Sequence, residues 1–165
     1  SPEFYATSNI NSKVKTPLEF VVASVRAVQA KGIYTDLPAA IKRMGMDLYQ
    51  YPLPTGYSDT GDDWVSSTAL QERVRFVNWL ANARSGATYL DTTSLFNAQQ
   101  AVTAESIASD LLNWSIGGYY AELEWQTALE VLNAEGAFNP SASNAETRIR
   151  ETVGTVLSYP EFNYQ

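Results

Sequence analysis

The sequence predicts an all-α protein, an irregular bundle of six or seven helices with a Pro/Tyr-rich loop packed on it. Three observations carry this prediction. Apolar residues recur every three to four positions in six segments, and most of these segments begin with a helix-capping pattern. No segment shows the sustained alternation of apolar and polar residues that is typical of hairpin strands. Because 165 residues is the size of one domain, we expect a single helical domain over residues 1–165.

The first two helices follow from their caps and apolar spacing. Thr16-Pro17-Leu18-Glu19 combines a capping box with proline at the first helical position, and the helix is expected to stop by Gly32. Its predicted buried face consists of Leu18, Val21, Val22, Val25 and Val28. Asp36 opens the second helix, whose apolar residues in phase are Leu37, Ala40, Ile41, Met44 and Leu48. Gly45 falls inside this pattern, which suggests that another element packs closely there.

The third helix is predicted from a capping box at Thr68-Ala69-Leu70-Gln71 and reaches about Arg84. Its expected buried stripe consists of Leu70, Val74, Val77, Leu80 and Ala81, widened by Phe76 and Trp79. Such a wide apolar face indicates a central helix. Residues 85–102 carry the weakest pattern and predict at most a short helix from Thr93 to Gln100.

Three more helices complete the predicted bundle. Thr103 caps the first of them, which ends at Gly117-Gly118. The next covers residues 119–135 and is followed by Gly136. The last is capped by Ser143-Asn144-Ala145-Glu146 and ends before Pro160.

The chain contains no cysteine and no histidine. Disulfides, thiolate nucleophiles and imidazole ligands are therefore excluded, which leaves carboxylates, Lys, Tyr, Ser and Thr for any acid–base or nucleophilic chemistry. No glycine-rich phosphate loop and no pair of carboxylates at a spacing that would make them face each other is recognisable. We therefore name no catalytic residue and no cofactor, and expect no catalysis from this chain alone.

The net charge of −7 is unevenly distributed. Residues 1–84 carry nine Lys and Arg against eight Asp and Glu, whereas residues 85–165 carry two against ten. A surface that binds nucleic acid or an anionic membrane needs clustered Lys and Arg, so neither partner is expected for the second half. No run of 18 apolar residues occurs, so we expect no membrane span either.

The most distinctive segment is an aromatic, proline-containing loop ahead of the third helix. Tyr49, Tyr51, Tyr57 and Trp64 surround Pro52-Leu53-Pro54-Thr55-Gly56. Aromatic rings with polar edges are suited to stacking on sugars, so Tyr51, Tyr57 and Trp64 are candidate binding residues. In the alternative interpretation the loop folds back and plugs the helix bundle.

An acidic cluster, Asp59-Thr60-Gly61-Asp62-Asp63, follows this loop. Calcium prefers several oxygen ligands on a tight turn, so Asp59, Asp62 and Asp63 form a candidate site for weakly bound calcium. The spacing lacks the twelve-residue pattern of an EF-hand and its distal bidentate glutamate. The alternative is a polar turn whose carboxylates favour a neighbouring helix N-terminus.

Three segments together resemble a known bacterial family. The first is Pro52-Leu53-Pro54-Thr55-Gly56-Tyr57 with Trp64, Leu70 and Arg73 behind it. The second is Lys15-Thr16-Pro17-Leu18-Glu19-Phe20-Val21-Val22, followed by Arg26-Ala27. The third is a helix ending in Ser-Pro-Glu-Phe, found as Ser158-Tyr159-Pro160-Glu161-Phe162 and as Ser1-Pro2-Glu3-Phe4. In these features the chain resembles the family designated domain of unknown function 1800.

The resemblance implies a context rather than an activity. Members of the family are several times longer than this chain and often begin with an export signal. The resemblance therefore implies that this chain is the C-terminal part of a longer protein, which is secreted or periplasmic. Arg26 and Arg73 occupy positions of arginines that recur in the family. We expect both guanidinium groups to bridge loop carbonyls or a carboxylate such as Glu19 or Glu3. In the alternative, Arg73 anchors a ligand, which would require it to open onto a cleft.

Two kinds of function are compatible with the sequence. In one, the chain is a binding or packing module whose partner is a polysaccharide, a cell-surface protein or the missing N-terminal part of the same chain. In the other, it completes a larger hydrolase whose catalytic residues lie upstream.

Overall fold

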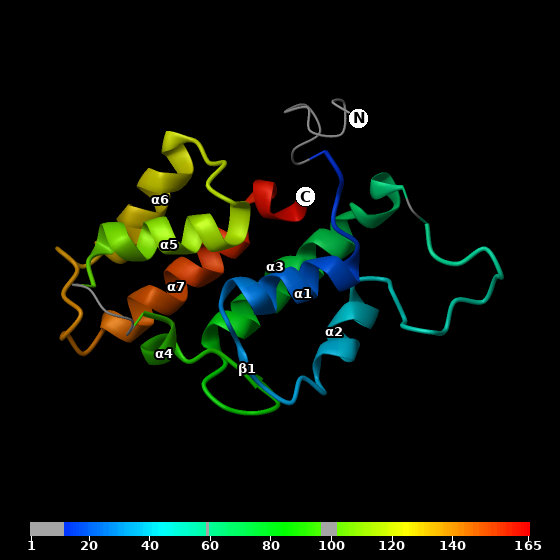
Figure 1. The fold of residues 1–165 in the computed structure, drawn as a ribbon, viewed down its shortest axis with the longest axis horizontal. Helices are drawn as coiled ribbons and strands as arrows, with labels where there is room; N and C mark the ends of the chain where they lie inside the picture. Colours follow the sequence, from blue (N-terminus) through cyan, green and yellow to red (C-terminus); the bar gives the residue numbers. More distant parts are fainter. Residues whose placement is uncertain (1–11, 59, 97–101) are drawn as a thin grey trace.

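The computed structural model describes residues 12–58, 60–96 and 102–165, and it has seven α-helices in that part of the chain (Figure 1). They are α1 (Pro17–Ala27), α2 (Leu37–Arg43), α3 (Ser67–Asn82), α4 (Thr92–Phe96), α5 (Ala104–Ile116), α6 (Glu122–Leu132) and α7 (Ala145–Leu157). Two 3₁₀ helices, η3 (Gly61–Trp64) and η4 (Pro160–Asn163), and the strands β1 (Lys31–Gly32) and β2 (Thr88–Tyr89) connect them. The predicted all-α class is confirmed.

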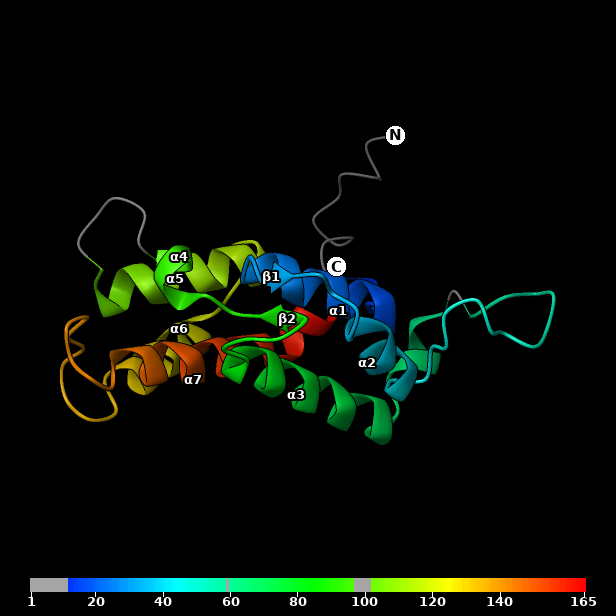
Figure 2. The same ribbon diagram turned by 90° about the horizontal axis from the view of Figure 1, so that it is seen from below.

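The helices form two layers around a common core. Figure 2 shows α1 and α5 in one layer and α3, α6 and α7 in the other. Helix α7 is central, since it packs against α3, α5 and α6. Gly154 allows α7 to approach α3 closely, because a Cβ atom at this position would lie 3.0 Å from Asn78 Oδ1 and 3.7 Å from the Ala81 Cβ atom.

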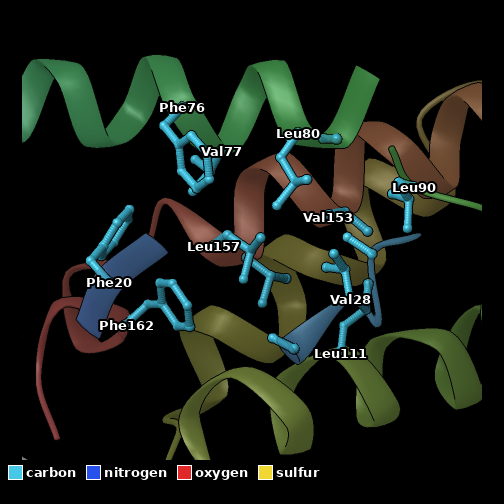
Figure 3. Close-up of a cluster of buried hydrophobic side chains, with 14 of the residues drawn as sticks. Phe20, Val28, Phe76, Val77, Leu80, Leu90, Leu111, Val153, Leu157 and Phe162 are labelled. Atoms are coloured by element: carbon cyan, nitrogen blue, oxygen red, sulfur yellow. The ribbon is translucent and has the colours of Figure 1, made fainter. Parts of the chain in front are cut away.

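The core is apolar and joins residues from both layers (Figure 3). Phe20 of α1 meets Phe162 of η4 edge to face, with ring centroids 5.3 Å apart. Other buried side chains in Figure 3 come from α3, α5, α7 and the loops: Val28, Phe76, Val77, Leu80, Leu90, Leu111, Val153 and Leu157. Among the described residues, no helix is long and apolar enough to cross a membrane.

Two short pairings of extended backbone tie distant segments together. Strands β1 and β2 are antiparallel, with Lys31 opposite Tyr89 and Gly32 opposite Thr88. Gly32 has φ 128°, and a Cβ atom there would lie 2.0 Å from the carbonyl oxygen of Ala87, so no other residue fits. At the other end of the bundle, Lys13 and Lys15 pair through their backbone with residues 163–165. The segment before α1 and the C-terminal segment are therefore neighbours.

Helix α1 begins as the sequence predicts. Thr16 is the N-cap, and its side chain and that of Glu19 form a reciprocal capping box. Lys13 Nζ also donates to Glu19 Oε1, at 2.6 Å. Burial disfavours the charged form of this carboxyl group, but hydrogen bonds from Lys13 and Thr16 outweigh it and lower the pKa of Glu19 to about 2. Thr103 caps α5 in the same way.

Several predicted helix ends were wrong. Helix α3 is capped by Ser66, whose hydroxyl accepts from the Ala69 amide, so Thr68 lies inside the helix. Helix α2 ends at Arg43, and Gly45 adopts φ 102° beyond it, with no atom within 4 Å of where a Cβ atom would lie. Gly45 thus serves a left-handed turn and not close packing. Neither Ser143 nor Asn144 caps α7 with its side chain. The Asn144 amide group donates to Glu135.

The predicted buried stripe of α3 is correct only in part. Phe76, Val77, Leu80 and Ala81 are buried, whereas Leu70 and Val74 are exposed. Arg73, which lies between these two positions in the sequence, is buried instead. The short helix predicted from Thr93 to Gln100 is found as α4, which begins at Thr92 and reaches Phe96 in the described part of the chain. Residues 97–101 lie outside the described part.

Two buried arginines of α7 bind the ends of other elements. Arg148 Nη1 donates to the carbonyl oxygens of Leu132 and Gly136, at 3.2 and 2.9 Å, where α6 ends. Arg150 donates to the carbonyl oxygens of Ala81 and Leu90, at 2.7 and 2.9 Å, and its Nε atom donates to Glu146. Both side chains therefore supply donors to carbonyls that a helix end or a loop leaves unpaired.

We predict that Arg150→Ala lowers the free energy of unfolding by about 3–5 kcal/mol, because it leaves buried carbonyls without a donor. Arg84→Ala is the matched control, since Arg84 pairs with the same Glu146 but is exposed, and it should cost about 0–1 kcal/mol. Urea unfolding of both variants measures the difference. Equal costs would contradict the structural role of Arg150.

A second prediction concerns acid stability. The pKa of Glu19 is lowered to about 2 in the folded protein, from about 4.3 in the unfolded chain. The ionised Glu19 carboxylate therefore stabilises the folded protein fully at pH values above the unfolded pKa, and this stabilisation is lost as the pH falls through the folded pKa. Urea unfolding of wild type and Glu19→Gln should therefore differ at neutral pH and converge in acid. Glu130→Gln, at an exposed position of α6, is the control. A difference that persists unchanged in acid would refute this assignment.

Candidate functional site

Arg73 is the centre of the candidate site. It lies in α3, is only 2% exposed, and meets three segments that are distant in the sequence. Nη1 donates to Asn163 Oδ1 at 2.9 Å, and Nη2 donates to the carbonyl oxygens of Lys15 and Trp64 at 2.6 and 3.4 Å. The guanidinium carbon also lies 4.9 Å from the centroid of the Phe20 ring. Among the described residues, Arg73 donates to two backbone carbonyls and one side-chain amide, as expected for a bridge to loop carbonyls. Glu3, the other carboxylate named as a possible partner, lies outside the described residues.

A second buried cation, Lys15, lies beside Arg73. Its Nζ atom donates to the carbonyl oxygens of Phe162, at 2.7 Å, and Tyr164, and it lies 4.7 Å from the Phe162 ring centroid. Burial and the positive charge of Arg73 lower the pKa of Lys15 to about 8. Burial likewise lowers the pKa of Arg73 to about 10. No role for Lys15 was predicted from the sequence, where only its place in the family-like Lys15-Thr16-Pro17 segment distinguishes it.

An apolar cavity of about 250 Å³ adjoins Arg73. Its walls come from α1, α3, the end of α7 and η4: Phe20, Leu70, Arg73, Val74, Leu157, Ser158, Pro160 and Asn163. Most polar groups of this wall have partners in the protein, since Ser158 donates to the Gly154 carbonyl and both Nη atoms of Arg73 are bonded. The buried Nε atom of Arg73 has no partner among the described residues. The cavity can therefore accept an apolar group, but it presents no acid, base or nucleophile.

Tyr51, Tyr57 and Trp64 form one row of aromatic rings. The centroids of Tyr51 and Tyr57 are 4.5 Å apart, and those of Tyr57 and Trp64 are 5.8 Å apart. The Tyr57 hydroxyl donates to the Asp47 carbonyl and the Trp64 indole nitrogen donates to the Ser58 carbonyl, at 2.6 and 3.1 Å. Because the Trp64 carbonyl accepts from Arg73, all four predicted binding residues lie in one continuous row.

Exposure changes steadily along this row. Tyr51 is 39% exposed, Tyr57 is partly buried and Trp64 is only 6% exposed. The Trp64 indole ring is packed in the core and offers no open face for a sugar. Tyr57 and Trp64 therefore attach the loop to the bundle, while the residues before Tyr57 are free to contact a partner.

Residues 49–56, here termed the projecting loop, extend away from the helices in both views (Figures 1 and 2). Every residue of this loop is exposed. Tyr49 is 100% exposed and has φ 62°, in the left-handed region that non-glycine residues rarely adopt. Residues 49–56 are thus not packed into the bundle, and the aromatic side chains that attach the loop, Tyr57 and Trp64, follow it in the sequence.

The acidic cluster can be placed only in part. Asp63 is exposed and accepts from Thr60 Oγ1 at 2.8 Å. Hydrogen bonds from the Ser58 and Thr60 hydroxyls hold the pKa of Asp63 below its usual value. Asp59 and the side chain of Asp62 lie outside the described part of the chain. No group of three His, Cys, Asp or Glu gathers at one point among the described residues, so weak calcium binding stays a prediction.

Comparison with known proteins identifies the family alone. The family model described as "Protein of unknown function (DUF1800)" matches residues 1–164. Neither a curated protein nor a solved structure matches the chain.

We predict that Arg73→Ala lowers the free energy of unfolding by about 2–4 kcal/mol, because three acceptors lose their buried donor. Arg73→Lys should recover little of this loss, since one ammonium group cannot reach the same three acceptors. Arg75→Ala, at an exposed position on the same helix, should cost about 0–1 kcal/mol. A melting temperature of Arg73→Ala equal to that of wild type would instead favour a ligand-binding role.

Proposed function

The chain belongs to the DUF1800 family of proteins of unknown function, and from its own structure we propose that it is a binding module whose projecting loop docks onto an uncharged, apolar surface of a protein partner. The observation that carries this proposal is the loop itself. It extends from the bundle, all of its residues are exposed, and its base is held by the packed side chains of Tyr57 and Trp64.

The composition of the loop favours a protein surface as its partner. No charged residue occurs between Leu48 and Ser58, and the exposed side chains include Tyr49, Tyr51 and Leu53. The central parts of protein interfaces are depleted of charge and enriched in aromatic residues. At the tip of the loop, Pro52 and Pro54 flank the exposed Leu53, which suits an apolar protein surface better than a sugar.

The backbone of the loop supports the same proposal. Tyr49 is held in a left-handed conformation that costs roughly 1–3 kcal/mol for a non-glycine residue, yet its fully exposed side chain makes no compensating contact within the bundle. Pro52 and Pro54 restrict the chain on either side of Leu53, which reduces the entropy lost when the loop binds. A strained, rigid and apolar segment is suited to insertion into a partner's pocket.

The cellular location of the protein is the second part of this proposal. We place it in a secreted or periplasmic protein, in keeping with a surface on which charged residues are few, at 18% of the sequence. The partner is a separate protein or another part of a longer polypeptide. If that other part is a hydrolase, the module completes it through the same loop.

Site-specific photocrosslinking tests the docking function. Replacement of Tyr49 by p-benzoylphenylalanine should give crosslinks to protein in cells that produce the protein, whereas the same replacement at Leu123, an exposed position of α6, should not. Leu53→Asp should reduce the yield at position 49 about tenfold, with the melting temperature unchanged. Mass spectrometry of the adduct then distinguishes a separate partner from the same polypeptide.

Two outcomes would overturn the docking function. One is equal crosslinking from positions 49 and 123, or none from either. The other is an adduct at position 49 that glycosidases remove, which would identify a polysaccharide as the partner.

A further inference from the structure

Arg26 is distinguished from the other basic residues by the lack of a partner. The sequence contains 11 Lys and Arg, all within the described residues. Ten of them donate a hydrogen bond or form an ion pair inside the protein: Lys13, Lys15, Lys31, Lys42, Arg43, Arg73, Arg75, Arg84, Arg148 and Arg150. Arg26 has no such partner among the described residues, and it is exposed. The sequence-based expectation that Arg26 bridges loop carbonyls or a carboxylate is therefore not met within the described part.

Arg26 borders a cavity of about 360 Å³ between α1 and α5. Trp114 and Ser115 of α5 form the opposite wall, and Gln29 lies at the same edge as Arg26. Figure 2 shows that α1 and α5 lie in the same layer of the bundle. This volume is near the lower end of ligand pockets, which favours a small ligand of one ring.

Trp114 is positioned to present its indole to this cavity. The ring stacks on Phe96 of α4, with centroids 5.9 Å apart and an angle of 26° between the planes. This contact holds the indole in place, while the side chain remains 38% exposed. The Ser115 hydroxyl donates to the Leu111 carbonyl at 2.7 Å, so its oxygen can still accept a hydrogen bond.

The placement of Arg26 in the last turn of α1 has a simpler partial explanation. A cation there interacts favourably with the helix dipole, by about 0.3–1 kcal/mol. The interaction with the helix dipole explains why a positive charge is favourable at position 26. It does not explain why a cavity adjoins Arg26, or why the partly exposed Trp114 indole is held on the other wall of that cavity. The three features together indicate a ligand site.

We propose that this cavity binds a ring-shaped carboxylate, with the carboxylate on Arg26 and the face of the ring on Trp114. A guanidinium group binds a carboxylate through two parallel hydrogen bonds, and an indole stacks on a flat or apolar ring face. A sugar acid and an aromatic acid share this chemistry. The site is separate from the projecting loop, and its test does not depend on the docking function.

Nuclear magnetic resonance can test this site, because each tryptophan indole N–H gives its own signal. Galacturonate should shift the Trp114 signal along a saturable curve, whereas galactose, which has the same ring without the carboxylate, should not. Benzoate provides the second arm of the experiment. Saturable binding of galacturonate identifies a sugar-acid site, and binding of benzoate alone identifies an aromatic-acid site.

Variants make the assignment specific. Arg26→Gln should weaken binding at least about tenfold, the loss of one charge-assisted pair, while leaving the melting temperature near that of wild type. Arg75→Gln, which removes an exposed arginine elsewhere, should bind as wild type does. The proposal is overturned if galactose binds as well as galacturonate, if Arg26→Gln binds unchanged, or if neither acid shifts the Trp114 signal.

Discussion

The structure depends most on one buried guanidinium group, that of Arg73. It joins the segment before α1, the end of η3 and the C-terminal η4 to α3 through the Lys15 carbonyl, the Trp64 carbonyl and the Asn163 amide. A buried cation without a carboxylate partner is costly unless most of its donors are hydrogen-bonded, so the acceptors of the two Nη atoms must keep their positions. The same constraint fixes the base of the aromatic row, and therefore the direction in which the projecting loop leaves the bundle.

The other buried cations follow one common rule, because each binds carbonyls at the end of a helix. Arg148 does so for α6, Arg150 for α3 and Lys15 for η4. The last carbonyls of a helix have no intrahelical donor, and several helices here end without a glycine cap. Long side chains from distant elements supply the missing donors. Secondary structure and tertiary packing are therefore linked at these ends, in a chain that has no cysteine to form disulfides.

Much of the helical pattern could be predicted from local signals. Thr16 was recognised as a cap because its capping box is complete within four residues, and Thr103 because a residue of this type opens an apolar helical pattern; the structure confirms both. The errors arose where distant groups decided the outcome: the Asn144 side chain donates to Glu135 and accepts no hydrogen bond from its own helix, and Arg73 takes a core position between Leu70 and Val74. Of the candidate site, the sequence indicated the residues of the aromatic row, but not that Trp64 would be buried or that Lys15 would join Arg73. Those features depend on which segments the fold brings together.

Native-state hydrogen exchange tests the central role of Arg73 most directly. The amides of Lys13, Lys15 and Gln165 hold the C-terminal segment against the segment before α1. In the wild-type protein they should exchange about as slowly as the core of α7, that is, through global unfolding. In Arg73→Met, these three amides should exchange at least about tenfold faster relative to the amides of α5. An unchanged ratio between the two sets of amides would contradict the account, because the C-terminal segment would then be held without the guanidinium group.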